Sequence, residues 1–213
     1  MMEALVTRDY GWSSANYPRS QLHVHDAILA AMQSRMPCSV LDLGCGNGFL
    51  AGRLADLGCE VVGVDPDEKG IQIASKTYPK VRFVREDAAS LRVNDVGRTF
   101  DVVVSSEVIE HLFDPIDMVG AAYRLLAPAG LFIVSAPYHG YLKNLVLALG
   151  GRWDSHHTTL RSGGHIKFWS VRTLTQLLES NGFQVVSWKG TGRVPFLWKS
   201  MIMCATPRPV TTS

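Results

Sequence analysis

Short apolar runs alternate with amphipathic segments through most of this chain. Five runs are short enough to be buried strands, at 40–43, 61–65, 81–84, 100–105 and 130–135. Segments with helical spacing separate the first three runs, at 49–57 and 67–76, and another helix is expected over 21–36. Strands that alternate with helices in this way predict an α/β fold built on a doubly wound, mostly parallel sheet.

A glycine-rich turn follows the first apolar run. Gly44, Gly46 and Gly48 alternate there, and glycine lets bare backbone approach a ligand because it has no Cβ and tolerates positive φ. The second run ends in Asp65, where a carboxylate can accept hydrogen bonds from ribose hydroxyls. Asp42, inside the first strand, would repel a pyrophosphate but suits an ammonium group. The pattern therefore favours a nucleoside with an amino-acid tail over a dinucleotide.

The sequences Leu-Asp-Leu-Gly-Cys-Gly-Asn-Gly and Gly-Val-Asp in these two segments resemble the first two motifs of class I S-adenosylmethionine-dependent methyltransferases. The resemblance implies S-adenosylmethionine as cofactor, with Asp87 accepting from the adenine amine, although Asp87 also fits an exposed turn. It places Glu107 along the methionine end of the cofactor. The expected cofactor-binding residues are Asp42, Gly44, Cys45, Gly46, Asn47, Gly48, Asp65, Pro66, Asp87, Ala88 and Glu107.

The same resemblance implies a seven-stranded sheet that ends in a C-terminal antiparallel hairpin, formed by 184–188 and 196–205. We expect Ser170 to cap a helix over 171–180. The whole chain, 1–213, is expected to be one domain, with an N-terminal arm and helix at 1–36 and a substrate-side insertion at 138–169. The aromatic residues Tyr10, Trp12 and Tyr17 in the arm fit either part of a lid or simple surface packing.

Composition limits the classes of partner. A net charge of +2 over 213 residues argues against a broad nucleic-acid surface. The cysteines form no C-x-x-C pair and fit reduced packing residues. Neither a signal peptide nor an apolar run of membrane-spanning length is evident, so a cytoplasmic protein is expected. The sequence leaves the oligomeric state open, a homodimer included.

A group of acidic and imidazole side chains follows the fourth predicted strand. Glu107, Glu110 and His111 fall within about one helical turn, and His165 follows in Gly-Gly-His-Ile-Lys-Phe-Trp. These segments resemble those of ubiquinone-type O-methyltransferases and of small-RNA 3′-terminal 2′-O-methyltransferases. In metal-dependent members the corresponding residues hold a divalent ion, which implies a site for Mg²⁺ or Mn²⁺ at Glu107, Glu110, His111 and His165. Many methyltransferases with a similar segment need no metal, so both interpretations stay open.

Methylation of an alcohol without a metal requires a base for the hydroxyl proton, and histidine has a suitable pKa. We expect His165 first, then His139 and His111, to serve as that base. The leading hypothesis is O-methylation of a small polar acceptor, such as a saccharide or glycoconjugate. Aromatic side chains would provide flat walls for its ring, namely Tyr138, Tyr141, Trp153, Phe168 and Trp169.

Two other functions are compatible with the residues. The Glu/His set also fits a metal-dependent RNA 3′-terminal 2′-O-methyltransferase, although the modest charge and the absence of a basic tract count against RNA. A cofactor-binding fold that serves as a non-catalytic partner subunit is the third interpretation.

Overall fold

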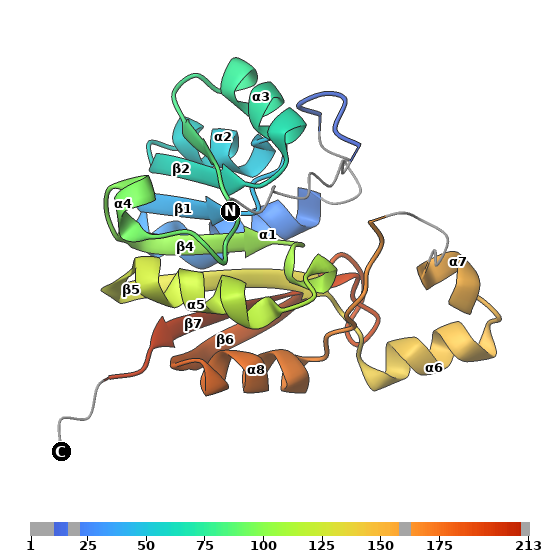
Figure 1. The fold of residues 1–213 in the computed structure, drawn as a ribbon. Coiled ribbons are helices and arrows are strands. Elements are labelled where there is room, and N and C mark those ends of the chain that lie inside the picture. The colour runs from blue at the N-terminus through green and yellow to red at the C-terminus, as the bar shows by residue number, and fades with distance from the viewer. Residues whose placement is uncertain (1–10, 17–21, 158–162, 210–213) are drawn as a thin grey trace, which may run out of the picture.

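The computed structural model describes residues 11–16, 22–157 and 163–209, and Figure 1 shows its fold. Seven strands form one sheet in the order β3-β2-β1-β4-β5-β7-β6. All neighbours pair in parallel except at β7, which runs antiparallel to both β5 and β6. The strands are β1 (Ser39–Leu43), β2 (Glu60–Asp65), β3 (Arg82–Arg85), β4 (Phe100–Ser106), β5 (Leu126–Pro137), β6 (Phe183–Thr191) and β7 (Ser200–Pro207). This confirms the predicted fold class.

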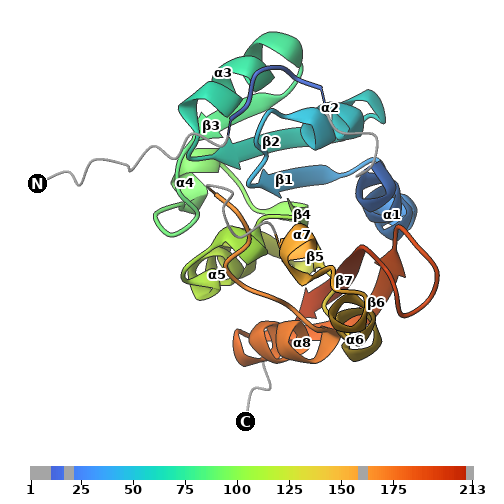
Figure 2. The same cartoon turned by 90° about the vertical axis from the view of Figure 1, so that its right-hand side faces the viewer.

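Helices cover both faces of the sheet. One face carries α1 (Leu22–Met32) and α2 (Phe49–Asp56), and the other carries α5 (Pro115–Leu125) and α8 (Val171–Ser180) (Figure 1). The remaining helical elements are η2 (Gln33–Arg35), α3 (Glu68–Thr77), α4 (Val93–Val96), η3 (Ile109–His111), α6 (Tyr141–Leu149) and α7 (Trp153–His157). Seen from the side, α6 and α7 lie at the end of the molecule that faces the viewer in Figure 2.

Two hydrophobic clusters form the core, one on each face. Alternate residues of β5 divide between them: Phe132 and Val134 pack toward α5 and α8, whereas Leu131 and Ile133 pack toward α1 and α2. This is the period of two that a strand imposes on its side chains. Burial of each large apolar side chain stabilises the fold by about 1.5–3 kcal/mol.

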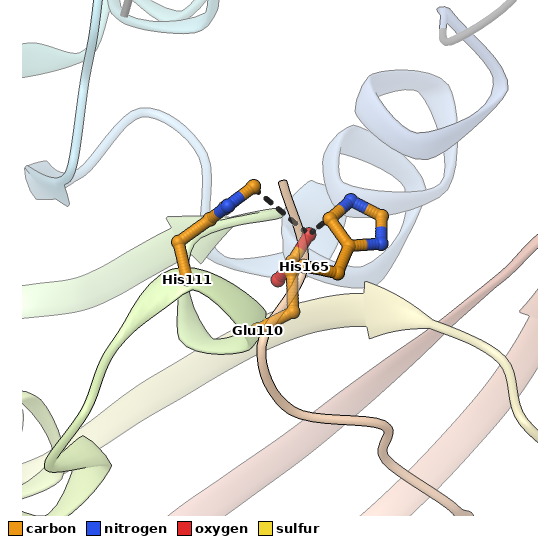
Figure 3. Close-up of side chains that lie close together, drawn as sticks. All are labelled: Glu110, His111 and His165. Atoms are coloured by element: carbon orange, nitrogen blue, oxygen red, sulfur yellow. Dashed lines mark ion pairs between the residues drawn. The ribbon is translucent and has the colours of Figure 1, made fainter. Parts of the chain in front are cut away.

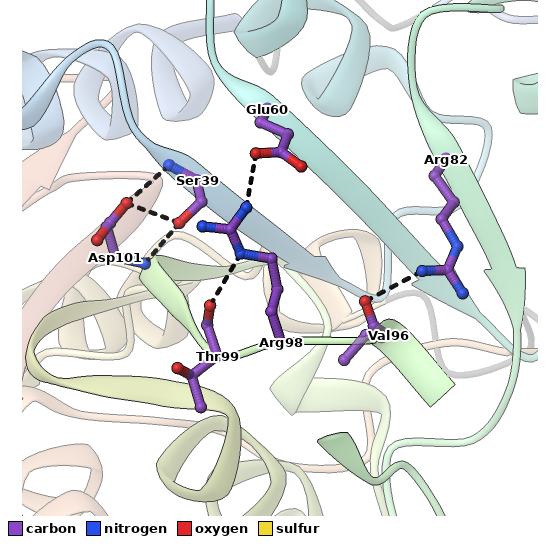
Figure 4. Close-up of polar contacts among 7 residues, drawn as sticks. All are labelled: Ser39, Glu60, Arg82, Val96, Arg98, Thr99 and Asp101. Atoms are coloured by element: carbon purple, nitrogen blue, oxygen red, sulfur yellow. Dashed lines mark hydrogen bonds and ion pairs between the residues drawn. The ribbon is translucent and has the colours of Figure 1, made fainter. Parts of the chain in front are cut away.

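Polar contacts fix the amino ends of the central strands, opposite to the carboxyl ends. The Asp101 carboxylate accepts hydrogen bonds from the Ser39 N–H and Oγ at 2.9 and 2.6 Å, joining β1 to β4 (Figure 4). These bonds hold the pKa of Asp101 below its usual value. The nearby Arg98–Glu60 ion pair, at 2.6 Å, is exposed, so its contribution to stability is small.

Helix boundaries follow the capping chemistry. Ser170 caps α8 as predicted, since its Oγ accepts from the Thr173 N–H. Asp114 likewise caps α5, and Pro115 occupies its first turn. One prediction was wrong at its start: β7 begins at Ser200, so 196–199 belongs to the connection from β6. Phe196 has φ of 65° there, a left-handed conformation that a strand does not accommodate.

Candidate functional site

The glycine turn between β1 and α2 lies beside the carboxyl end of β2. The N–H groups of Gly44 and Cys45 both donate to the Val64 carbonyl, at 2.8 and 3.1 Å. Gly44 has φ of 79°, and a Cβ at this position would come within 2.4 Å of Val108. The turn therefore requires glycine for both its conformation and its packing.

Asp65 joins the turn to the start of α3. Its two carboxylate oxygens accept hydrogen bonds from the N–H groups of Gly46 and Asp67, each at 2.8 Å. Burial raises the pKa of Asp65 to about 6, and these two hydrogen bonds limit the rise. A carboxylate has about four acceptor positions, so capacity for further donors remains.

Asp42 is a second buried carboxylate, in β1. Burial, followed by the nearby charge of Asp65, raises the pKa of Asp42 to about 7, against a hydrogen bond from the Ala51 backbone. Its Oδ2 atom is buried and accepts no hydrogen bond within the described part of the chain. A buried carboxylate oxygen of this kind favours a cationic or hydrogen-bond-donating ligand nearby.

Residues 11–16 lie against the glycine turn. The Asn47 Nδ2 group donates to the carbonyls of Ser14 and Asn16, at 3.0 and 3.1 Å. The Trp12 ring packs so closely that a Cβ on Gly46 would come within 2.6 Å of it. Of the arm aromatics that fit either part of a lid or surface packing, Trp12 thus contacts the turn, while Tyr10 and Tyr17 lie outside the described residues.

The acid at the end of β3 forms part of a local turn. Asp87 is exposed, and its Oδ1 atom accepts from the Ala89 N–H at 2.9 Å. Its charge also acts on Asp65, so the two expected cofactor acids share one edge of the sheet. Ala88 packs against the core beneath, and the Pro66 carbonyl accepts from Arg85 at 3.4 Å.

Glu107 follows β4 in a strained conformation. Its φ is 55°, which is uncommon for a residue with a side chain and is often found at functional sites. Ser135 Oγ donates to one carboxylate oxygen at 3.1 Å, and Ser200 Oγ donates to the other at 3.2 Å. Burial raises the pKa of Glu107 to about 7 despite these hydrogen bonds. The two serines, on β5 and β7, were not identified from the sequence.

Glu110, His111 and His165 converge beyond the end of β4 (Figure 3). Glu110 Oε1 lies 3.8 Å from His111 Nε2 and 3.9 Å from His165 Nε2, and one donor atom of each residue lies within 4.8 Å of the others. Glu110 is almost fully buried, and its carboxylate oxygens accept no hydrogen bond from the described residues. Burial, followed by the charge of Glu107, raises the pKa of Glu110 well above its usual value.

Backbone contacts place His165 against this cluster. The N–H groups of Ile166 and Lys167 both donate to the Glu110 carbonyl, at 2.9 and 3.0 Å. His111 Nδ1 lies 3.3 Å from the Gly164 carbonyl. Because a carbonyl only accepts, a neutral His111 in this contact carries its proton on Nδ1, and its unprotonated Nε2 lies beside Glu110. Together these side chains could hold a divalent cation, or one of the two imidazoles could accept a proton.

The expected four-ligand metal set is brought together only in part. Glu110, His111 and His165 form the cluster, whereas the oxygens of Glu107 are directed to Ser135 and Ser200. The ligand atoms that do converge, from one carboxylate and two imidazoles, fit a divalent ion, and the buried Glu110 oxygens accept no hydrogen bond from the part of the chain that the structure describes.

His139 lies in a second cluster, with two histidines of α7. Its ring stacks on His157 at 5.6 Å and lies 6.1 Å from His156, while Phe168 packs on its edge at 5.0 Å. Burial, and then the charge of Lys143, lower the pKa of His139 to about 4. His139 is therefore neutral at physiological pH.

Lys143 is a buried cation that the sequence did not reveal. Its Nζ group donates to the Tyr138 and Lys199 carbonyls, at 2.6 and 3.4 Å. Burial, and then the charge of Arg193, lower its pKa to about 8, and the charge of Glu107 opposes the change. The one available signal was a lysine within the apolar sequence Tyr-Leu-Lys-Asn-Leu-Val-Leu-Ala-Leu of α6.

Comparison with known proteins adds independent information. A family model described as "Methyltransferase domain" matches residues 18–188. The chain is 34% identical to the ubiquinone biosynthesis O-methyltransferase of Roseobacter denitrificans, over 81% of this chain and 71% of that protein. It is 36% identical to a probable S-adenosylmethionine-dependent methyltransferase of Mycolicibacterium smegmatis, over 68% of this chain but only 52% of the relative, about half its length.

Solved structures share the fold. Magnesium protoporphyrin IX methyltransferase from Synechocystis, solved with bound S-adenosylhomocysteine, has a TM-score of 0.67 at 20% identity. The match covers 93% of this chain and 91% of that chain.

Within the described ranges, no helix combines the length and hydrophobicity that crossing a bilayer would require.

Proposed function

Because the chain belongs to the S-adenosylmethionine-dependent methyltransferases and is similar to the ubiquinone-biosynthesis O-methyltransferases, we propose that it transfers a methyl group from S-adenosylmethionine to a hydroxyl of a small acceptor. The observation that carries the proposal is the pairing of Asp65 with the Gly46 N–H beside a bare glycine turn. This arrangement supports a ribose at the end of β2.

The proposed cofactor site uses both buried acids. Asp65 would accept from the ribose hydroxyls, while Asp42 would favour the positively charged amino-acid end through its charge. Asp87 and Ala88 would contact the adenine. Glu107, held by Ser135 and Ser200, would lie toward the methionine end. The methyl group on the sulfur of the bound cofactor would thereby point toward the cluster of Glu110, His111 and His165.

The glutamate and histidines of that cluster would handle the proton. As the acceptor oxygen attacks, the new O–CH₃ bond forms and the S–CH₃ bond breaks, which leaves S-adenosylhomocysteine. The hydroxyl proton passes to a neutral imidazole, for which His165 is the proposed base. His111, with its Nε2 lone pair beside Glu110, is a second acceptor at the same position. The buried Glu110 carboxylate would stabilise the imidazolium that results.

A divalent cation would be held by Glu110, His111 and His165. When bound, it would supply a Lewis acid that lowers the pKa of the acceptor hydroxyl. The role of Glu110 would then be to provide the anionic ligand, and the backbone bonds from Ile166 and Lys167 would keep His165 in place.

The acceptor is proposed by class only. A saccharide or other ring-bearing alcohol stays the prediction, and it is supported by Phe168 on His139 and Trp153 on His157, since the flat faces of these aromatic side chains can pack on a ring. A hydroxyl at an RNA end would use the same Glu110 cluster, so it belongs in the same acceptor panel.

Turnover with labelled S-adenosylmethionine tests the proposal. Saccharides, phenols, short RNA and amines would be offered with and without chelator, followed by re-addition of Mg²⁺ or Mn²⁺. We expect label on a hydroxyl acceptor, and losses of about 100-fold or more in His165→Ala and Glu110→Gln. Glu179→Gln, on the exposed part of α8, serves as the matched control.

Each outcome has a distinct meaning. A chelator effect reversed by metal supports the cation at Glu110. Labelling of amines alone contradicts O-methylation. Binding of S-adenosylhomocysteine without turnover on any acceptor would favour the non-catalytic partner subunit.

A further inference from the structure

Helix α6 is attached to the sheet through the side chain of Lys143. Among the residues of α6, all of which the structure describes, Lys143 is the only buried one, at 4% exposure. A lysine is rarely buried unless its ammonium group is paired or hydrogen-bonded. Here Nζ donates to the carbonyls of Tyr138 and Lys199, at 2.6 and 3.4 Å. An apolar side chain could be buried there without this requirement, so the ammonium group itself needs an explanation.

The two carbonyls belong to neighbouring strands, at the point where the pairing of these strands ends. Pro137 of β5 is the last residue that pairs with β7, opposite Ser200. Just beyond this pair, the Tyr138 N–H donates to the Lys199 carbonyl at 2.9 Å. Lys143 donates to the same carbonyl and to that of Tyr138, and a charged donor makes a stronger hydrogen bond than a neutral one. Lys143 therefore joins the carboxyl end of β5 to the amino end of β7.

The residue that follows this junction holds Glu107. Ser200, adjacent to Lys199, donates through its Oγ to one oxygen of the Glu107 carboxylate at 3.2 Å. Ser135 of β5 donates to the other oxygen at 3.1 Å and accepts from the Glu107 N–H at 3.0 Å. Both serines are buried. The orientation of Glu107 thus depends on the alignment of β5 with β7.

Electrostatics also connects Lys143 with Glu107. Burial has the largest effect on the pKa of each group, but the charge of Lys143 lowers the pKa of Glu107, and the charge of Glu107 raises that of Lys143. Glu107 has φ of 55°, and a residue in such a conformation persists only where the surrounding structure supports it. The junction that Lys143 closes provides this support.

We propose that Lys143 is a positioning residue, which keeps Glu107 in place for the cofactor. Its ammonium group holds β5 and β7 in the alignment that lets Ser135 and Ser200 both reach the Glu107 carboxylate. The inference rests on the proposed function, in which Glu107 lies toward the methionine end of S-adenosylmethionine. Lys143 acts on the cofactor only through Ser200 and Glu107.

A double-mutant cycle tests this inference. Lys143→Met keeps an unbranched side chain but removes the ammonium group, and Ser200→Ala removes one hydroxyl from Glu107. The affinity for S-adenosylhomocysteine, measured by titration calorimetry, should fall about tenfold in each variant. The double variant should bind about as weakly as either single variant, because both substitutions interrupt the same contact. Independent effects would multiply to a loss of about 100-fold, and that result would overturn the inference.

Turnover kinetics and a matched control distinguish positioning from a general loss of stability. Lys143→Met should raise KM for S-adenosylmethionine about tenfold and leave kcat within about twofold, because the lost contact is shared by the bound and transition states. Lys189→Met removes an exposed lysine from β6 and should leave both constants unchanged. If Lys143→Met does not fold, Lys143→Gln replaces it in the same cycle. A folded variant that loses stability but keeps full affinity for S-adenosylhomocysteine would overturn the inference.

Amide exchange without ligand distinguishes a failure of this inference from a failure of the proposed function. In Lys143→Met, the N–H groups of Tyr138 and Glu107 should exchange about tenfold faster or more, whereas that of Val62 in β2 should keep its rate. Unchanged exchange at Tyr138 and Glu107 would overturn the role of Lys143, whatever the protein binds. Faster exchange in a protein that binds no S-adenosylhomocysteine would overturn the proposed function, and with it the role of Lys143 toward the cofactor.

Discussion

Buried carboxylates mark the site at the scale of single residues. Burial raises the pKa of Asp42 and Glu107 to about 7 and that of Asp65 to about 6. Each of these groups is costly to ionise in the unliganded protein, and all three follow or lie within strands at one edge of the sheet. A ligand that supplies hydrogen-bond donors or a positive charge would stabilise these buried carboxylates, which explains why they lie there.

Asp42→Asn tests the energetic cost of the carboxylate in β1. Because the folded-state pKa of Asp42 is raised, its contribution favours folding below the unfolded pKa and is lost as pH rises toward about 7. As pH rises from about 5 to about 8, the free energy of unfolding of the unmodified protein should therefore fall relative to that of Asp42→Asn. The difference between the two should change by roughly 2–4 kcal/mol in favour of the variant. Urea unfolding at both values measures the difference.

Asp101→Asn is the matched control, because the pKa of Asp101 is shifted downward by Ser39. Its stabilising contribution is present above the unfolded pKa and is lost only as pH falls through the folded value. The stability deficit of Asp101→Asn should thus stay constant over the same pH interval. A constant difference for Asp42→Asn as well would contradict the account of Asp42.

The turn residues were predictable, but the buried lysine was not. Gly44, Gly46 and Asp65 are recognisable because their roles depend on neighbours in sequence and on strand ends. Lys143 depends on the Lys199 carbonyl and on Arg193, which come from the distant β6–β7 connection. Ser135 and Ser200 likewise acquire their contact with Glu107 through the pairing of β5 with β7.

At the scale of elements, short segments complete the site. The segment 163–169 reaches Glu110 through backbone bonds, and 11–16 reaches the glycine turn through Asn47. The sequence predicted long periodic helices well, because their apolar spacing is a local property. It did not predict η3 or the contact of α7 with His139, since both depend on tertiary packing.

Asn47→Ala tests the attachment of residues 11–16 to the turn. The substitution removes the hydrogen bonds that Asn47 donates to the Ser14 and Asn16 carbonyls and the one that it accepts from the Phe49 N–H, worth about 0.5–1.5 kcal/mol each. We expect faster amide exchange in 11–16 and 44–48, and an affinity for S-adenosylhomocysteine lower by about three- to tenfold.

Asn94→Ala, at an exposed position of α4, is the control for that substitution and should leave both measurements unchanged. Unaltered exchange in Asn47→Ala would show that Asn47 does not hold the segment.

At the scale of the whole molecule, one continuous sheet joins every part of the described site. β1, β2, β4 and β5 carry the candidate residues at their carboxyl ends, and both hydrophobic clusters run along the sheet. The seven-stranded, mostly parallel sheet and its C-terminal antiparallel hairpin followed from the family pattern. The position of α6 did not, because its apolar pattern indicates a core-facing helix, whereas Tyr141, Leu142, Leu145, Val146 and Leu149 are exposed.

The single-domain prediction has a thermodynamic consequence. Calorimetry should show one cooperative unfolding transition, because the sheet is shared by all elements. Saturation with S-adenosylhomocysteine at about 100 times its dissociation constant should add about 2.7 kcal/mol to the free energy of unfolding. Two resolved transitions, of which only one responds to the ligand, would contradict a single domain.

Isothermal titration of the unmodified protein and of Asp65→Asn with S-adenosylhomocysteine, NAD⁺ and ATP is the most direct test of the cofactor site. We predict one site for S-adenosylhomocysteine, weakened about tenfold or more in Asp65→Asn, and no binding of either phosphate-containing ligand. Binding of NAD⁺ or ATP in place of S-adenosylhomocysteine, or an affinity indifferent to Asp65, would contradict the site proposed between β1 and β2.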